Sequence, residues 1–112
     1  MATDEGASDL NARPLEIDQL IAYRKGATVS STILTKEAGT VTLFSFDAGQ
    51  GMSEHTAPYD ALLLMLDGEA KVVIADISHA VKAGEFIIMP ANEPHSVQAL
   101  QRFKMMLVMV RS

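Results

Sequence analysis

Three histidines are the side chains of this chain best suited to chemistry at neutral pH. The 112 residues include His55, His79 and His95 but no cysteine. The lack of cysteine excludes disulfides, cysteine-based zinc sites, iron–sulfur clusters and a thiol nucleophile. Histidine titrates near neutral pH and is the commonest metal ligand in proteins. His55 and His95 each follow a segment that carries glycine or proline, which makes both of them candidates for a binding site.

Short β-strands punctuated by glycine and proline dominate the predicted secondary structure, and Asp67-Gly68 is the strongest hairpin signal. Apolar residues at positions 17, 20 and 21 predict one or two helical turns capped at Gly26. We therefore predict an all-β barrel or sandwich with a short N-terminal helical segment. Residues 1–13 are predicted to be a flexible tail, and residues 14–112 a single domain. The predicted strands cover residues 29–35, 40–46, 61–66, 69–76, 78–81, 85–89, 95–100 and 102–110.

Two segments of the chain place glycine and proline at particular distances from a histidine. Five residues separate Gly84 from Pro90, and four separate Pro90 from His95, while His55 precedes Gly68 in the other segment. These segments resemble the paired motifs of the cupin superfamily, and the chain is similar to its small single-domain members of the cupin 2 or RmlC-like type. The resemblance covers about residues 39–110. It implies a double-stranded β-helix, a jelly-roll barrel with both motifs at its mouth.

The resemblance also implies a metal site that is incomplete. Members of the superfamily typically hold a divalent iron, zinc, manganese or nickel ion with three histidines and a glutamate. His55 and His95 match two of these ligands, but Ala57 stands at the second histidine position and Ala61 at the glutamate position. A catalytic zinc ion normally has three protein ligands, so two histidines with alanine neighbours indicate a degenerate metal site.

The remaining oxygen donors are weaker candidates for a third ligand. Strand alternation predicts that Glu54 and Asp60 lie on the opposite phase from His55. Gln98 and Gln101 are possible but weak donors. None of these four side chains is therefore assigned to a metal.

Other side chains are predicted to form the wall of a pocket beside the histidines. If the strand that carries His55 continues past Pro58, the same alternation places Tyr59 on the face of His55. Met65 shares the phase of the apolar residues Ala61 and Leu63. His79 is predicted to be a solvated surface group in a turn. The residues predicted to contact a bound small molecule are His55, His95, Tyr59 and Met65.

Composition restricts the partners of the chain. Its net charge is −5 and it has no lysine or arginine cluster, which argues against binding to nucleic acid. It has no apolar run of about 18 residues and no signal peptide at its start, so neither a membrane span nor export is expected. The expected location is the cytoplasm.

Three functions remain open. The first is a small-molecule-binding barrel with a degenerate metal site, which the two alanines favour. The second is a metal-dependent enzyme of the oxygenase or isomerase type that uses His55 and His95. The third is a non-catalytic dimeric protein with a structural or interaction role. The sequence leaves open whether the protein is an enzyme. We also expect a homodimer, because apolar strands at residues 33–34 and 105–110 need cover.

Overall fold

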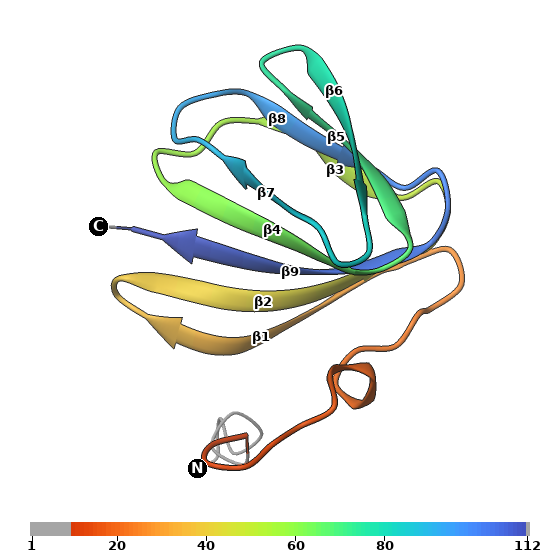
Figure 1. Cartoon of the computed structure of the whole chain (residues 1–112), viewed down its shortest axis with the longest axis vertical. Helices are drawn as coiled ribbons and strands as arrows, with labels where there is room; N and C mark the ends of the chain where they lie inside the picture. The colour runs from red at the N-terminus through yellow and green to blue at the C-terminus, as the bar shows by residue number, and fades with distance from the viewer. Residues whose placement is uncertain (1–9, 112) are drawn as a thin grey trace.

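The computed structural model describes residues 10–111, in which the regular secondary structure is almost all β-strand (Figure 1). This architecture confirms the predicted all-β fold. The strands are β1 (Thr28–Lys36), β2 (Gly39–Phe46), β3 (Gly51–His55), β4 (Asp60–Asp67), β5 (Glu69–Ile74), β6 (Ile77–Lys82), β7 (Phe86–Met89), β8 (His95–Gln98) and β9 (Phe103–Val110).

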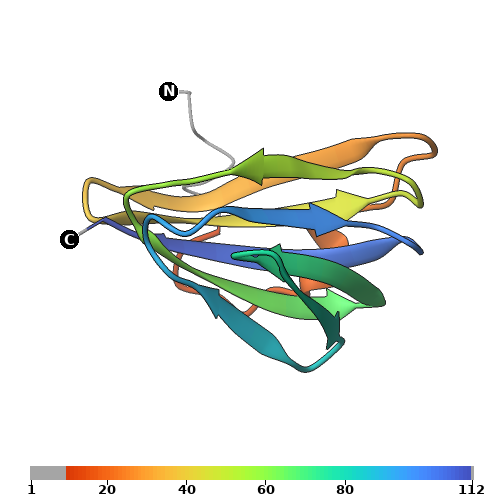
Figure 2. The same cartoon turned by 90° about the horizontal axis from the view of Figure 1, so that it is seen from above.

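The strands form two antiparallel sheets that lie one above the other (Figure 2). The five-stranded sheet has the order β1-β2-β9-β4-β7, and the four-stranded sheet has the order β3-β8-β5-β6. Chain neighbours such as β4 and β5 lie in different sheets, as a double-stranded β-helix requires. The two inner faces enclose a core of Phe46, Ala61, Leu63, Met65, Ala70, Val72, Val81, Met89, Val97, Ala99, Phe103 and Met105.

Alternation along β4 shows why the sequence gives two packed layers. Ala61, Leu63 and Met65 are buried in the core, whereas the leucines between them are only half-buried and point outward. A strand with one face in the core buries every second side chain. β4 pairs with β7 on one side and with β9 on the other, so it lies inside its sheet.

Asp67-Gly68 turns the chain, but it does not form the predicted hairpin. β4 and β5 belong to different sheets, so the two residues carry the chain from one layer to the other. Gly68 has a φ of +80°, and a Cβ atom there would lie 2.5 Å from the carbonyl oxygen of Arg102. Glycine is therefore required by both backbone conformation and close packing.

A hairpin that was not predicted joins β5 to β6. The predicted strand over residues 69–76 ends at Ile74, which pairs with Ile77 across a two-residue turn. Both turn residues, Ala75 and Asp76, have positive φ, as a type I′ turn requires. The prediction failed because alanine is not one of the residues that usually mark this turn.

The N-terminal residues 10–23 form a strap across the outer surface of the five-stranded sheet. The predicted helical turns reduce to one 3₁₀ turn at Ile17–Gln19, and Gly26 lies in a later turn with a φ of +69°. Ile21 of the strap is buried at 4% exposure. Residues 1–9 of the predicted tail lie outside the described residues. No helix within residues 10–111 is long and apolar enough to cross a membrane.

Five polar side chains, here called the strap cluster, fix the strap to the barrel. The buried Ser45 hydroxyl donates a hydrogen bond to the carbonyl oxygen of Ala22 at 2.8 Å. The Tyr23 hydroxyl donates to the Asp67 carboxylate at 2.5 Å. The largely buried Lys104 forms an ion pair with the exposed Asp18 at 3.1 Å. The strap cluster therefore consists of Asp18, Tyr23, Ser45, Asp67 and Lys104.

Candidate functional site

The two motif histidines meet because the strands that carry them are neighbours. His55 is the last residue of β3 and His95 is the first residue of β8. The two strands pair antiparallel, with His55 directly opposite His95. Side chains directly opposite each other on antiparallel strands point to the same face, so residues forty positions apart in the chain converge on one place.

The two imidazole rings face each other through their Nε2 atoms. These atoms are 3.2 Å apart, and the ring centroids lie 4.3 Å apart with the planes crossing at 68°. We call His55 and His95 the histidine pair. At this distance one atom or ion can interact with both Nε2 atoms at once.

Backbone carbonyl groups determine which nitrogen of each ring carries a proton. His55 Nδ1 lies 2.8 Å from the carbonyl oxygen of Ser53, and His95 Nδ1 lies 3.1 Å from that of Glu93. A carbonyl oxygen can only accept a hydrogen bond, so both Nδ1 atoms are assigned as protonated. In the neutral rings the two Nε2 atoms are then unprotonated and lie side by side. A proton or another cation is needed to make the contact between them favourable.

The two histidines differ in their contact with water. His95 is buried at 7% exposure, whereas His55 is exposed. Burial lowers the pKa of His95 below its ordinary value, and the charge of His55 lowers it further, while the hydrogen bond to the Glu93 carbonyl opposes this shift. Burial therefore favours the neutral form of His95.

Two hydrogen bonds hold together the loops that flank the pair. The Asp60 carboxylate accepts a hydrogen bond from the backbone of Ala91 at 2.8 Å, and the Asn92 N–H donates to the carbonyl of Ala57 at 2.7 Å. Asn92 has a φ of +68°, a conformation that asparagine tolerates better than most residues. The left-handed backbone of this loop therefore suits asparagine.

A third acidic or histidine ligand is missing from the described residues. No group of three or more His, Asp, Glu or Cys side chains within residues 10–111 is placed to hold a metal ion. The chain leaves its strand at His55 and follows an irregular path until β4 begins at Asp60. The strand does not continue through the segment around Pro58, so the alternation that would place Tyr59 on the face of His55 does not apply.

The other two predicted site residues lie in different surroundings. Tyr59 is half-buried, and the guanidinium group of Arg111 lies 5.9 Å from its ring centroid. Met65 is 1% exposed and belongs to the core between the sheets. Met65 is thus a packed core side chain.

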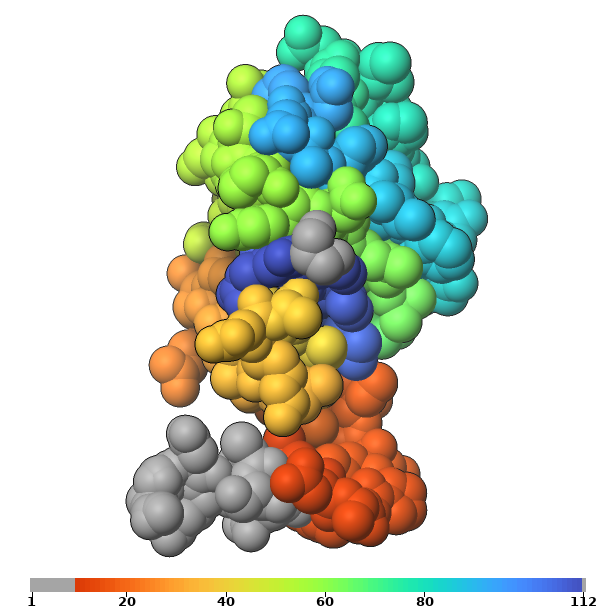
Figure 3. Space-filling model, turned by 90° about the vertical axis from the view of Figure 1, so that its left-hand side faces the viewer, coloured from red at the N-terminus to blue at the C-terminus, as the bar shows by residue number. Residues whose placement is uncertain are grey.

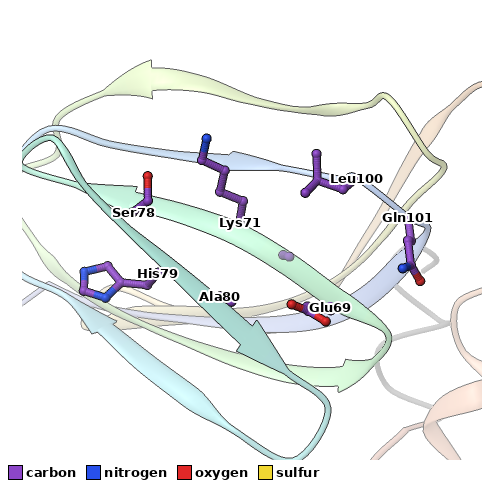
Figure 4. Close-up of a pocket in the computed structure, with 8 residues that line it drawn as sticks. Glu69, Lys71, Ser78, His79, Ala80, Leu100 and Gln101 are labelled. Atoms are coloured by element: carbon purple, nitrogen blue, oxygen red, sulfur yellow. The ribbon is translucent and has the colours of Figure 1, made fainter.

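A separate hollow borders the third histidine. His79 is half-buried within β6 rather than solvated in a turn. It lines a hollow of about 290 Å³ whose wall also includes Lys71 of β5 and Leu100 of the β8–β9 connection (Figure 4). Neither His55 nor His95 lines this hollow. No motif in the sequence indicates this hollow, because His79 was predicted to be solvated and Leu100, which is 75% exposed, belongs to no motif.

Comparison with known proteins assigns the family. The family model described as "Cupin domain" matches residues 42–111, which include both motif histidines. This chain is a cupin. Among functionally curated proteins, no match is found.

Solved cupin structures resemble this cupin over most of its length. A conserved protein of unknown function from Streptococcus pyogenes is 32% identical, with a TM-score of 0.86, covering 91% of this chain and 90% of that one. A cupin superfamily protein from Desulfitobacterium hafniense is 29% identical, with a TM-score of 0.84 and coverage of 89% and 92%. A cupin 2 conserved barrel domain protein from Leptotrichia buccalis is 38% identical, with a TM-score of 0.79, but only 45% of it is covered, against 82% of this chain.

The donors of this cupin fit part of the metal site that the superfamily implies. Two nitrogen ligands of a tetrahedral zinc ion, each at about 2.0–2.1 Å, lie about 3.3 Å apart. The 3.2 Å between the two Nε2 atoms matches this spacing. The alanines at the other two ligand positions offer no donor atom. The histidine pair can therefore occupy two neighbouring positions around an ion and leaves the others to water or to a ligand.

Proposed function

We propose that this cupin binds a divalent transition-metal ion through the histidine pair and uses the open positions of that ion to bind a small molecule. The single observation that carries the proposal is the approach of two unprotonated Nε2 atoms to 3.2 Å of each other. A cation between them removes their mutual repulsion. Iron, zinc, manganese and nickel are the candidate ions, because imidazole ligands suit this group of metals.

The carbonyl partners of the two rings support the same proposal. Metal-binding histidines usually donate their other ring N–H to a carbonyl or carboxylate group, which fixes the tautomer and the orientation of the ring. Ser53 and Glu93 supply such carbonyl groups to His55 and His95. Both imidazoles are therefore oriented before any ion arrives.

The alanines support an open site for a small molecule. Ala57 and Ala61 stand where other cupins carry ligands, so two protein donors would hold the ion and several of its positions would be free. When bound, such an ion would supply Lewis acidity to an oxygen atom of the small molecule. Whether a chemical step follows binding depends on groups that the small molecule itself brings.

Metal titration of the wild type and three alanine variants tests this proposal. We expect the wild type to bind about one equivalent of Zn²⁺ or Ni²⁺ in competition with a chromophoric chelator. His55→Ala and His95→Ala should each weaken binding by more than about 100-fold, since loss of a ligand exceeds the 10- to 100-fold effect of losing its hydrogen-bond partner. His79→Ala, which removes the histidine outside the pair, should bind as the wild type does.

Two results would overturn the metal proposal. One is a wild type that binds none of the four metals at micromolar concentrations. The other is equal binding by the wild type and both pair variants. If the wild type bound neither a metal nor a small molecule, a non-catalytic structural role would remain.

The second candidate is a barrel that binds a small molecule without metal. The alanines favour it, because without further ligands a proton can replace the ion between the two Nε2 atoms, and the pair then carries one positive charge. Such a pair would bind a carboxylate. Thermal-shift titration with small carboxylic acids in the presence of EDTA separates the candidates: a shift that survives EDTA supports the metal-free barrel, and one that disappears supports the metal.

A further inference from the structure

A hollow of about 290 Å³ lies on the outer surface of the four-stranded sheet. Side chains of β5 alternate between the two faces of this sheet: Ala70 and Val72 are buried in the core, whereas Glu69 and Lys71 lie on the outward phase and are half-buried. His95 is buried on the inner face of the neighbouring strand β8. The hollow and the histidine pair are therefore on opposite faces of the same sheet.

The connection between β8 and β9 forms one wall of the hollow. Its buried residue Ala99 is fixed by two backbone hydrogen bonds: its N–H donates to the carbonyl of Gln50 at 2.9 Å, and its carbonyl accepts from the N–H of Gly49 at 2.8 Å. The next two residues, Leu100 and Gln101, line the hollow. This wall is therefore held in place by the backbone before any ligand arrives.

A small side chain provides the floor of the hollow. Ala80 of β6 pairs directly with Lys71, and its methyl group leaves space between longer neighbours. Figure 4 shows Lys71, Leu100, Gln101 and Glu69 around an open stretch of the sheet, with the ring of His79 outside this group. The hollow residues, as defined here, are the six outward-facing or loop residues Glu69, Lys71, Ser78, Ala80, Leu100 and Gln101.

Two opposite charges border the hollow without a partner from the chain. Among residues 10–111, no ion pair or side-chain hydrogen bond engages the Glu69 carboxylate or the Lys71 ammonium group. Lys82 stands opposite Glu69 in the strand pairing, yet the two form no ion pair. Lysine and glutamate are seldom removed from water without a partner. Both half-buried charges are therefore free to bind a ligand.

Leu100 adds an apolar contact beside these charges. It is 75% exposed, the highest value among the large apolar side chains of the described residues. Covering such a side chain with an apolar group is favourable. The strap does not cover it, because Figure 3 shows β8 and the β5–β6 hairpin at the end of the molecule away from the orange-red strap. An apolar group of a ligand can therefore reach Leu100.

We propose that this hollow binds a small zwitterion, an α-amino acid with an apolar side chain. The Lys71 ammonium group donates to the carboxylate of the ligand, and the Glu69 carboxylate accepts from its ammonium group. Leu100 contacts the apolar side chain. The volume of about 290 Å³ is close to the lower limit of roughly 300 Å³ for ligand pockets, so it suits a small molecule of this kind.

The spacing of the two charges favours a free amino acid over a peptide. Glu69 and Lys71 are two residues apart on one strand, which places their Cα atoms roughly 6.6–6.8 Å apart. Charge-assisted hydrogen bonds occupy ~2.7–2.9 Å at each end. The two charges of the ligand must therefore lie on neighbouring groups, as they do in a free α-amino acid, whereas the terminal charges of a peptide are further apart.

Titration of the nitrogen-15-labelled protein with L-leucine, followed by amide NMR in the presence of EDTA, tests the proposal. Millimolar leucine should shift the amide resonances of the hollow residues. Isocaproate, which lacks the ammonium group, and isoamylamine, which lacks the carboxylate, should each bind about 10-fold more weakly, because each loses one hydrogen bond between charged groups. Glycine, which keeps both charges but has no side chain, should also bind more weakly than leucine.

Variants of the hollow residues identify the groups that bind leucine. Lys71→Gln and Glu69→Gln should each weaken binding by about 10-fold. Lys36→Gln and Glu37→Gln are the matched controls, since they remove the same charges at the far β1–β2 turn and should leave binding unchanged. Ala80→Leu should abolish binding by filling the floor of the hollow while both charges remain. Circular dichroism shows whether each variant keeps the strand content of the wild type.

Three results would overturn the proposal. The first is a wild type whose hollow resonances do not shift with millimolar leucine. The second is isocaproate or isoamylamine binding as tightly as leucine. The third is equal leucine binding by the wild type, Lys71→Gln and Glu69→Gln. Loss of binding in folded hollow variants, with both charge controls intact, would support it. EDTA makes each of these outcomes independent of metal binding by the histidine pair.

Discussion

The strap cluster and the histidine pair both join distant parts of the chain through polar side chains. They differ in how the hydrogen-bonding groups of those side chains find partners. In the strap cluster each donor has its own acceptor: Tyr23 donates to Asp67, and Ser45 donates to Ala22. In the histidine pair two acceptors face each other, because both Nδ1 protons are already engaged. A hydrogen bond between a donor and an acceptor stabilises the fold. Two neighbouring acceptors repel each other unless a proton or a metal ion lies between them.

This difference separates stability from binding. Within the described residues no buried side-chain nitrogen or oxygen lacks a hydrogen-bond partner. For His95 Nε2 the partner is His55 Nε2, so its satisfaction depends on what lies between the two rings. Changes in the strap should therefore lower the free energy of unfolding without altering metal affinity, whereas changes in the pair should lower metal affinity.

Truncation of the buried strap residue should give the largest loss of stability. Ile21→Ala removes a side chain that is only 4% exposed and should lower the free energy of unfolding by about 2–4 kcal/mol. Urea denaturation of the metal-free protein measures this loss. Zn²⁺ affinity of the folded variant should equal that of the wild type, and a parallel fall in affinity would break the separation of the two regions.

Removal of the tyrosine hydroxyl should have a smaller effect on the same quantity. Tyr23→Phe keeps the aromatic ring against the guanidinium group of Arg102 but deletes the hydrogen bond to Asp67. We expect a loss of about 1 kcal/mol, below the 1.5–3 kcal/mol of buried bonds to charged groups, because this site is partly exposed. Tyr59→Phe, which removes a hydroxyl outside the strap cluster, is the control, and equal losses in both variants would contradict the assignment.

Acidification should weaken the metal-free protein through the buried member of the pair. Because the pKa of His95 is lowered by burial, the unfolded chain binds a proton at this residue more readily than the native chain does. The stability that neutral His95 provides is complete above its unfolded value of about 6.5 and is lost as the pH falls through the lower native value. Denaturation midpoints in EDTA between pH 7.5 and 5 measure this slope.

Two variants test whether His95 causes this pH dependence of stability. His95→Gln should flatten the fall in stability on acidification, whereas His79→Gln should retain it. A wild type that becomes more stable as the pH decreases through this window would show that the pair gains a proton on folding, which is the opposite sign.

The sequence predicted the strand-rich fold because alternating burial leaves a period of two along the chain, as in β4. Turn residues were less informative. Asp67-Gly68 indicates that the chain reverses, but residue type does not show whether the next strand joins the same sheet. Ala75-Asp76 forms a tight hairpin without a glycine. The apolar spacing at residues 17–21 suits a helix, yet packing against the sheet leaves a single 3₁₀ turn.

The candidate site was predictable only where the motif spacing determined it. His55 and His95 were identified from glycine and proline positions, and strand pairing brings them together. Tyr59 was placed by an alternation that ends at His55. The tautomers of the pair depend on the backbone carbonyl groups of Ser53 and Glu93. The orientation of these groups follows from the folded backbone and cannot be predicted from the residue types.

The most direct test of the central claim is nitrogen-15 NMR of the imidazole rings before and after addition of Zn²⁺. For the metal-free protein we predict Nδ1–H tautomers at His55 and His95, with His79 as an internal reference. One equivalent of Zn²⁺ should shift the Nε2 resonances of both pair histidines together and leave those of His79 in place. Protonated Nε2 atoms on both neutral rings, or Nε2 resonances that Zn²⁺ leaves unchanged, would contradict a metal ion held by this pair.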